Sequence, residues 1–138
     1  MNKNILSPKG SIDQSLFIIY YIVLTILYIA GGLFLIIYVY KNNLPSLYYM
    51  WPLLLIKILI AFNYKKRILD ICKNLPVAVI LGFILTFDIE GLAACQLIKD
   101  IQVSMLTFFA LGIFFLFIQP AIIALIPGEL DKNMTKEE

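Results

Sequence analysis

Two long stretches without any charged residue dominate the hydropathy pattern of this chain. The first runs from Gln14 to Tyr40 and the second from Ile101 to Gly128. Each is longer than the roughly 20 apolar residues with which an α-helix crosses about 30 Å of hydrocarbon. Helices satisfy their backbone polar groups internally, as a bilayer requires. The pattern therefore predicts spanning helices over approximately 15–40 and 103–125, with a kink at Gln119-Pro120 in the second.

Two shorter apolar stretches between these helices predict two more crossings. One covers approximately 44–64, from near Pro45 to a basic cluster. The other begins near Pro76, because proline is tolerated in a first helical turn, where its missing N–H would be unpaired anyway. This stretch is uncharged only as far as Phe87. We assign the helix to approximately 75–97, but the sequence does not define where its outer end lies. We therefore predict a single all-α integral membrane domain, a bundle of four transmembrane helices, with a flexible polar tail at 129–138.

Composition supports a membrane protein. The chain is 62% apolar and 14% charged, whereas soluble domains are about half apolar and about a quarter charged. One water-soluble core in 138 residues cannot enclose that much apolar surface. The net charge of +2 is too small to indicate nucleic acid as a partner.

The basic residues are divided unevenly between the two ends of the predicted bundle. The end that carries both termini receives Lys3, Lys9, Lys65, Lys66, Arg67, Lys73, Lys132 and Lys136. The opposite end has only Lys41 and Lys99. Because basic residues beside short loops stay in the cytoplasm, both termini are predicted to face inward (N-in, C-in). This topology separates Cys72 from Cys95 across the bilayer.

Three charges lie where charge is costly. Lys57 is roughly 10 Å from the inner end of helix 44–64, and a lysine near mid-membrane costs about 3 kcal/mol. Asp88 and Glu90 follow the uncharged part of helix 75–97. These are the candidate functional charges, for proton or cation handling; the alternatives are a snorkelling or internally paired lysine and solvated acids at a helix end. Because Asp88 lies roughly 20 Å along its helix, we do not expect it to pair directly with Lys57.

A face of small residues predicts close helix packing. Ala78, Gly82 and Thr86 recur every four residues on helix 75–97. Small residues let the backbones of neighbouring helices approach closely. Such packing matters in lipid, because the hydrophobic effect contributes little to helix association there. The face packs either within the chain, against helix 44–64 or 103–125, or against another subunit.

The cytoplasmic basic loop consists of Lys65, Lys66, Arg67, Asp70 and Lys73. It is first a determinant of topology, and recognition of anionic lipid is a further possibility. Within it, Asp70 is three residues from Arg67 and four from Lys66, so pairs can form if the preceding helix continues.

The segment from Lys66 to Asn74 resembles the Arg-Arg-Leu-His-Asp-Ile-Gly-Lys-Ser signature of a bacterial inner-membrane family, the domain of unknown function 805. Lys9-Gly10-Ser11-Ile12 resembles that family's Gly-Arg-Ile-Ser entry to the first helix. Pro127-Gly128, with Asn133, resembles its Pro-Gly-Thr-x-Gly-x-Asn exit. The chain departs from the pattern at Ser11, Leu69, Cys72 and Pro76. The resemblance implies a four-helix protein of the bacterial inner (cytoplasmic) membrane and no defined biochemical role.

Catalysis is not expected. The chain has no histidine, which excludes the commonest general base and zinc ligand, and it has no Gly-rich phosphate loop. We therefore expect no cofactor and no metal. The predicted function is a small accessory or scaffold subunit of a membrane assembly, with lipids and other membrane subunits, or further copies of itself, as partners. The alternatives are a transporter or channel component that acts as an oligomer through Lys57 and Asp88 or Glu90, and a protein that binds anionic lipid.

Overall fold

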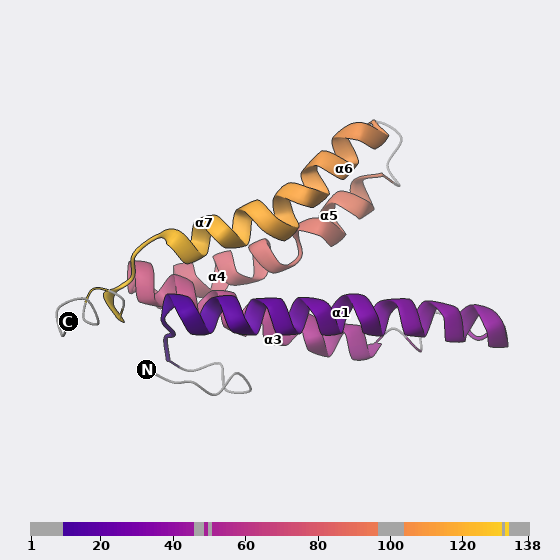
Figure 1. Ribbon diagram of the computed structural model, residues 1–138, viewed down its shortest axis with the longest axis horizontal. Helices are drawn as coiled ribbons and strands as arrows, with labels where there is room; N and C mark the ends of the chain where they lie inside the picture. The colour runs from indigo at the N-terminus through magenta and orange to yellow at the C-terminus, as the bar shows by residue number, and fades with distance from the viewer. Residues whose placement is uncertain (1–9, 46–48, 50, 97–103, 131, 133–138) are drawn as a thin grey trace.

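Every regular element in the described part of the chain is a helix. The computed structural model describes residues 10–45, 49, 51–96, 104–130 and 132. In chain order the helices are α1 (Gln14–Asn42), α3 (Trp51–Cys72), α4 (Leu75–Thr86), α5 (Asp88–Cys95), α6 (Met105–Ile113), the π-helix η2 (Phe114–Ile118) and α7 (Gln119–Leu125) (Figure 1). The predicted all-α class is confirmed.

Two helices among the described residues are long and apolar enough to cross a membrane. These are α1 and the continuous helical segment Met105–Leu125, and they match the two uncharged stretches of the sequence. The bent pair α4 and α5 makes a third if it is counted as one span. Membrane-spanning length and composition are thus present in the described helices, as expected for a membrane protein.

α1 has well-defined ends. The Asp13 carboxylate accepts a hydrogen bond from the Leu16 N–H at 3.1 Å and caps the first turn. At the other end Asn43 has a left-handed backbone with φ of 51°, and its N–H bonds to the Tyr40 carbonyl. Lys41 lies in the last turn, where a positive charge is favourable. Helix formation therefore follows the uncharged run closely.

α3 continues through the basic loop, whereas the hydropathy pattern predicts an end near Tyr64. It ends at Cys72, and Lys73 then adopts a left-handed φ of 53°. Lysine, arginine, leucine and isoleucine are good to moderate helix formers, so nothing local stops the helix at the first charge. Asn74 begins α4 by accepting the Val77 N–H. The expected start of the helix at residue 44 differs from the observed start at Trp51; residues 46–48 and 50 lie outside the described part.

The helix expected over 75–97 is two helices, α4 and α5, with a 50° bend between them. Phe87 stands at the break with φ −100° and ψ 19°, outside the regular helical region. The Asp88 carboxylate accepts the N–H of Ile89 at 2.7 Å, and Asp88 and Glu90 lie in the first turn of α5. Acids are favourable there because of the helix dipole. Residue 97 lies outside the described part.

At Gln119-Pro120, where the sequence predicts a kink, the structure has the π-helix η2 immediately before the proline, within one continuous span. Pro120 has no N–H, so it cannot bond to the Leu116 carbonyl as an ordinary helical residue would. That carbonyl instead accepts a hydrogen bond from the Tyr21 hydroxyl at 2.7 Å. A side chain of α1 thus satisfies the backbone group that the proline leaves open.

The small-residue face of α4 packs against α3 within the chain. Ala78, Gly82 and Thr86 are all buried. A Cβ atom at Gly82 would stand 3.1 Å from the Lys65 backbone nitrogen and 3.2 Å from the Ala61 carbonyl oxygen. The sequence allowed packing either within the chain or against another subunit. The structure has the packing within the chain, and α3 is the partner helix.

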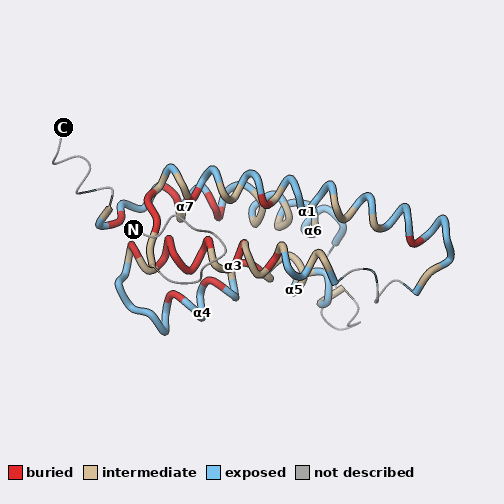
Figure 2. Tube along the Cα trace, turned by 90° about the horizontal axis from the view of Figure 1, so that it is seen from below, coloured by how far each residue is buried: buried red, intermediate tan, exposed pale blue. Residues whose placement is uncertain are grey.

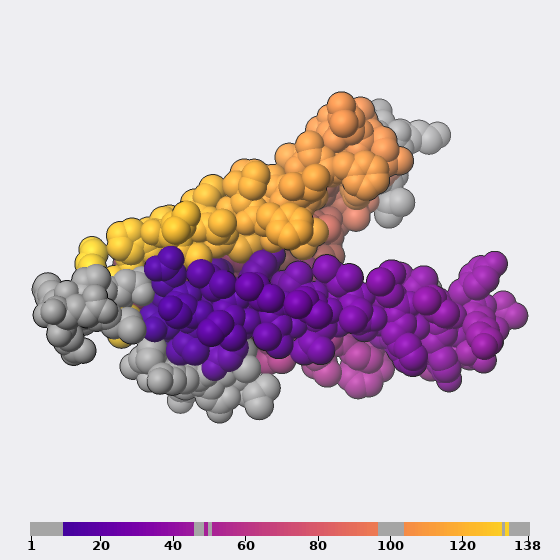
Figure 3. Space-filling view, in the orientation of Figure 1, coloured from indigo at the N-terminus to yellow at the C-terminus, as the bar shows by residue number. Residues whose placement is uncertain are grey.

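The core is concentrated at the end of the molecule that holds the α3–α4 turn. Its aromatic centre is Phe17, Tyr21 and Tyr64, with Phe17 and Tyr64 edge to face at 5.4 Å between ring centroids. Figure 2 shows buried residues gathered at this end of α3 and α7, and exposed residues along the outer half of α1. Away from this end, α5 and α6 form an arm that diverges from α1 and α3, which leaves an open notch in the surface (Figure 3).

Apolar side chains on α1 and α6 are strongly exposed. Phe34 on α1 is 68% exposed and Leu106 on α6 is 82% exposed. Water-soluble monomers rarely expose continuous apolar surface on this scale. The surface suits hydrocarbon or another apolar helix.

Candidate functional site

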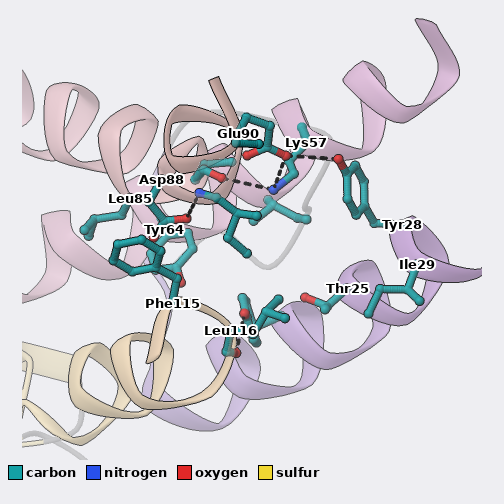
Figure 4. Close-up of a pocket in the computed structure, with 15 residues that line it drawn as sticks. Thr25, Tyr28, Ile29, Lys57, Tyr64, Leu85, Asp88, Glu90, Phe115 and Leu116 are labelled. Carbon is teal, nitrogen blue, oxygen red and sulfur yellow. Dashed lines mark hydrogen bonds and ion pairs between the residues drawn. The ribbon is translucent and has the colours of Figure 1, made fainter. Parts of the chain in front are cut away.

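A cavity of about 340 Å³ lies where the arm formed by α5 and α6 separates from α1 and α3 (Figure 4). Its walls come from α1, α3, the break between α4 and α5, and η2. Most of the lining is apolar, but polar side chains converge on it, among them Thr25, Tyr28, Lys57, Tyr64, Asp88 and Glu90. All three charges singled out in the sequence therefore line one cavity.

Lys57 has three kinds of partner in this cavity. Its Nζ atom is 2.9 Å from Oε1 of Glu90 and donates a hydrogen bond to the Thr86 carbonyl oxygen at 3.1 Å. It also lies 4.6 Å from the centre of the Tyr28 ring. A carboxylate, a carbonyl dipole and an aromatic face all attract a cation. The residue as a whole is 8% exposed, so the ammonium group has exchanged water for these partners.

The sequence predicts no direct pair of Lys57 with Asp88 and places the two residues at different heights. The structure pairs the lysine with Glu90, and the expected difference in height is wrong. That expectation measured Lys57 from a helix ending near Tyr64. Because α3 continues to Cys72, Lys57 is roughly 22 Å from the α3–α4 turn, and Asp88 is roughly 20 Å from the start of α4. The two antiparallel helices bring the lysine and the acids to the same level.

Glu90 shares one oxygen between two donors. Its Oε1 atom receives the Tyr28 hydroxyl at 3.0 Å as well as the Lys57 ammonium. Its Oε2 atom is buried and has no hydrogen-bond partner among the described residues. Half of this carboxylate's hydrogen-bonding capacity is therefore uncommitted.

Asp88 also has an uncommitted oxygen. Oδ1 accepts the Ile89 N–H, whereas Oδ2 is buried without a hydrogen bond in the part of the chain that is described. The Gln119 side chain of α7 approaches this carboxyl group without a regular hydrogen bond to Oδ2. With Asp88, Glu90 and Lys57 all ionised, two negative charges face one positive charge.

The described residues contain no group of three or more histidine, cysteine, aspartate or glutamate side chains placed to hold a metal ion. The cavity has two carboxylates, and Lys57 already neutralises one of them. The cavity is then left with one negative charge, which matches a singly charged cation better than a divalent one.

The basic loop forms a second cluster, inside the protein. The Arg67 side chain is fully buried, and its Nη2 atom donates to the carbonyl oxygens of Ala124 at 2.9 Å and Ile126 at 2.6 Å. Its Nε atom donates to the Ile123 carbonyl at 3.4 Å, and Nη1 pairs with Asp70 at 3.4 Å. The last carbonyls of a helix lack helical partners, and a cation is favourable there. Arg67 therefore caps the end of α7.

Asp70 connects the same cluster to the C-terminal segment. Its Oδ1 atom accepts the Leu130 N–H at 3.2 Å, and Gly128 packs directly against the carboxylate. A Cβ atom at Gly128 would overlap Oδ2 of Asp70. The flexible tail expected from residue 129 is thus held at its beginning, also by the exposed 2.7 Å pair of Lys73 with Glu129. Residues 131 and 133–138 lie outside the described part.

Burial separates Lys73 from the other members of the loop. Lys65, Lys66, Arg67 and Asp70 are buried, whereas Lys73 is exposed. Burial lowers the pKa of Lys65, and it lowers the pKa of Lys66 together with the neighbouring charge of Lys65. The loop is therefore mainly an internal structural cluster and presents one exposed basic side chain.

The segments that carry the family resemblance lie at the same end of the structure. Ile12 is fully buried in the core cluster that also contains Ile68, beside Arg67. Gly10 has a φ of 88°, which favours glycine. Pro127 and Gly128 follow α7, where Arg67 and Asp70 hold the chain. Asn133 lies outside the described residues.

Two important side chains were missed from the sequence. Tyr28 completes the Lys57 and Glu90 site, and Asn63 donates from Nδ2 to the Phe17 carbonyl at 3.1 Å. For Tyr28 a signal exists: Tyr21, Thr25 and Tyr28 form a polar row at helical spacing within an otherwise apolar helix. Such a row indicates the face of a membrane helix that turns away from lipid.

Comparison with family models, curated proteins and solved structures gave no match.

Proposed function

We propose that this chain is an integral membrane protein with four crossings whose cavity binds a small monovalent cation. In this proposal it takes part in moving that cation across the membrane, as an oligomer or together with other subunits. The observation that carries it is the Lys57–Glu90 pair with Asp88 beside it, in a cavity lined by a broken helix.

The four crossings would be α1, the first part of α3, α4 with α5, and α6 to α7. In support, the start of α1, the α3–α4 turn and the end of α7 lie at the same end of the structure (Figure 1). The buried basic loop is also at this end, and the excess of basic residues favours a cytoplasmic location. Of the other basic residues used in that argument, Lys3, Lys9, Lys99 and Lys136 lie outside the described part. The bacterial inner membrane is proposed on the family resemblance alone.

The two native cysteines provide a test of this topology. In right-side-out membrane vesicles, a membrane-impermeant maleimide is expected to label Cys95 and spare Cys72, and in inverted vesicles the result should reverse. Both thiols are free, and they lie toward opposite ends of the predicted crossings. The variants Cys72→Ser and Cys95→Ser assign each signal to one thiol. Labelling of both cysteines from one face would exclude an odd number of crossings between them.

Energetics favour a functional role for the charges in the cavity. Ionisable groups within a membrane are costly, and a buried ion pair often contributes no more to stability than apolar side chains of similar volume. Irregular backbone at membrane depth is tolerated where it lines a cavity, and broken helices often form the ion and substrate sites of transporters. Both α4–α5 and η2 border this cavity.

A flux assay with Lys57→Leu tests the proposal. Purified protein in liposomes is challenged with proton, potassium and methylammonium gradients in turn, with an internal pH dye as the readout for protons and tracer uptake as the readout for the other two cations. Wild-type protein is expected to move at least one of these cations, and Lys57→Leu and Glu90→Gln should reduce that flux to the level of protein-free liposomes. Lys73→Gln, a matched control at an exposed lysine outside the cavity, should leave it unchanged. Full flux with Lys57→Leu would remove this lysine from the mechanism.

A second candidate is an accessory or scaffold subunit without catalysis of its own. The notch in the surface (Figure 3) and the exposed apolar side chains of α1 and α6 favour it, because a helix of another membrane protein or of a second copy can pack against such side chains. Absence of flux for all three cations in the wild-type assay would favour this candidate. Anionic-lipid recognition by the basic loop has less support, because Lys65, Lys66 and Arg67 are buried.

A further inference from the structure

We propose that the cavity recognises a small primary organic amine in its ammonium form, and that Lys57 occupies this site as a built-in ligand. This inference rests on the proposed function, since it names the class of cation. In this view an incoming amine takes over the contacts of the lysine ammonium, and the lysine moves toward Asp88.

The surroundings of the Lys57 ammonium are those of an amine site. An ammonium group carries three N–H donors and no acceptor. Two acceptors are provided by Oε1 of Glu90 at 2.9 Å and the Thr86 carbonyl at 3.1 Å. The Tyr28 ring, 4.6 Å away, provides the aromatic face that commonly binds organic cations. The Tyr28 hydroxyl meanwhile donates to Glu90 and holds the carboxylate in place.

Charge and hydrogen bonding leave room for one further cation. Oδ2 of Asp88 and Oε2 of Glu90 are both buried acceptors without a hydrogen bond among the described residues. Unsatisfied buried polar groups are costly, and charged ones more so. Two carboxylates and one ammonium, all ionised, carry a net charge of −1, which one monovalent cation neutralises. Lys57 is paired with Glu90 at 2.9 Å, and its charge also acts on the Asp88 carboxylate in the same cavity (Figure 4).

The size and walls of the cavity favour an organic cation over a bare metal ion. A volume of about 340 Å³ lies at the lower end of the range for small-molecule pockets. The rest of the lining is largely apolar and includes Ile29, Ile60, Leu85 and Phe115. Such walls suit an alkyl body, whereas a hard metal cation needs several oxygen ligands around it. The chemistry is therefore that of a charged head group attached to a short apolar chain.

The test replaces the internal ligand with an external one. Lys57→Ala in detergent or nanodiscs removes the lysine and leaves Glu90, Tyr28 and Thr86 in place. Addition of n-butylammonium chloride is expected to raise the unfolding midpoint of this variant saturably, with a dissociation constant at least about tenfold lower than for wild type. Tetramethylammonium chloride, which has the same charge and no N–H donor, and sodium chloride are the matched controls.

A second substitution locates the binding. Glu90→Gln in the Lys57→Ala background should remove the n-butylammonium effect, because the carboxylate that binds the ammonium is gone. If Lys57→Ala does not fold, Lys57→Met, of similar length and without charge, replaces it in the same titration. Equal responses to n-butylammonium and tetramethylammonium, or full retention after Glu90→Gln, would overturn the inference.

The binding test and the flux assay can fail independently of each other. Saturable n-butylammonium binding that depends on Glu90, without any flux in liposomes, would support the amine site and reject cation movement. Flux of protons or potassium that depends on Lys57, without n-butylammonium binding, would support movement and reject the amine as ligand.

Discussion

Replacing Arg67 with leucine is expected to destabilise the protein by about 3–5 kcal/mol, the range for breaking a buried charged pair from one side. The substitution removes the guanidinium that pairs with the buried Asp70 carboxylate and donates to the carbonyls of Ala124 and Ile126. Net stabilities of proteins are about 5–15 kcal/mol, so this loss removes a large share of the total. The unfolding midpoint in mild detergent and the monodisperse yield both measure it.

Two further substitutions make the Arg67 prediction specific. Lys73→Leu breaks an exposed pair with Glu129, and exposed pairs contribute about 0–1 kcal/mol, so its unfolding midpoint should stay near that of wild type. Arg67→Lys should also be destabilising, because a single ammonium cannot reproduce the spread donors of a guanidinium. Wild-type stability of Arg67→Leu would mean that the cap on α7 is not needed for folding.

Gly82→Ala and Gly112→Ala are expected to change stability in opposite directions. At Gly82 the new methyl group would lie 3.1–3.2 Å from backbone atoms of Lys65 and Ala61, so α4 and α3 must move apart. Overpacking of this kind costs about 1–3 kcal/mol. At Gly112, on α6, nothing lies within 4 Å of the added atom, and alanine is the better helix former by up to about 1 kcal/mol.

The two glycine variants are compared by their unfolding midpoints in the same detergent. Gly91→Ala, on α5, is a second control, since its added methyl group also meets nothing within 4 Å. Destabilisation by all three substitutions to the same extent would show that glycine flexibility matters more than the α3–α4 contact.

Local patterns in the sequence located most of the helical segments. The uncharged runs coincide with α1 and with Met105–Leu125, because a spanning helix depends on length and composition, which are visible along the chain. The start of α4 near Pro76 and the disturbance before Pro120 also follow from local backbone chemistry. The continuation of α3 beyond Tyr64 was not predicted, although its residues are helix formers, because the hydropathy pattern ends at the first charge and does not show that Arg67 packs against α7 inside the protein.

That single difference in helix length explains the main error about the site. A helix that ends near Tyr64 puts Lys57 and Asp88 at heights that differ by roughly 10 Å. With α3 ending at Cys72, the two residues are level. The sequence did identify Lys57, Asp88 and Glu90 as charges in an apolar setting, because their cost in lipid depends on residue type and position alone.

By itself, the amino-acid sequence determined the all-helical class, the two longest candidate spans and the residues that carry charge within apolar segments. Only the tertiary structure decided that Lys57 pairs with Glu90 and contacts the face of the Tyr28 ring, and that the buried Arg67 side chain caps α7. The physical reason is that helix formation depends on neighbours along the chain, whereas these pairings depend on helix length, the α4–α5 bend and segments far apart in sequence.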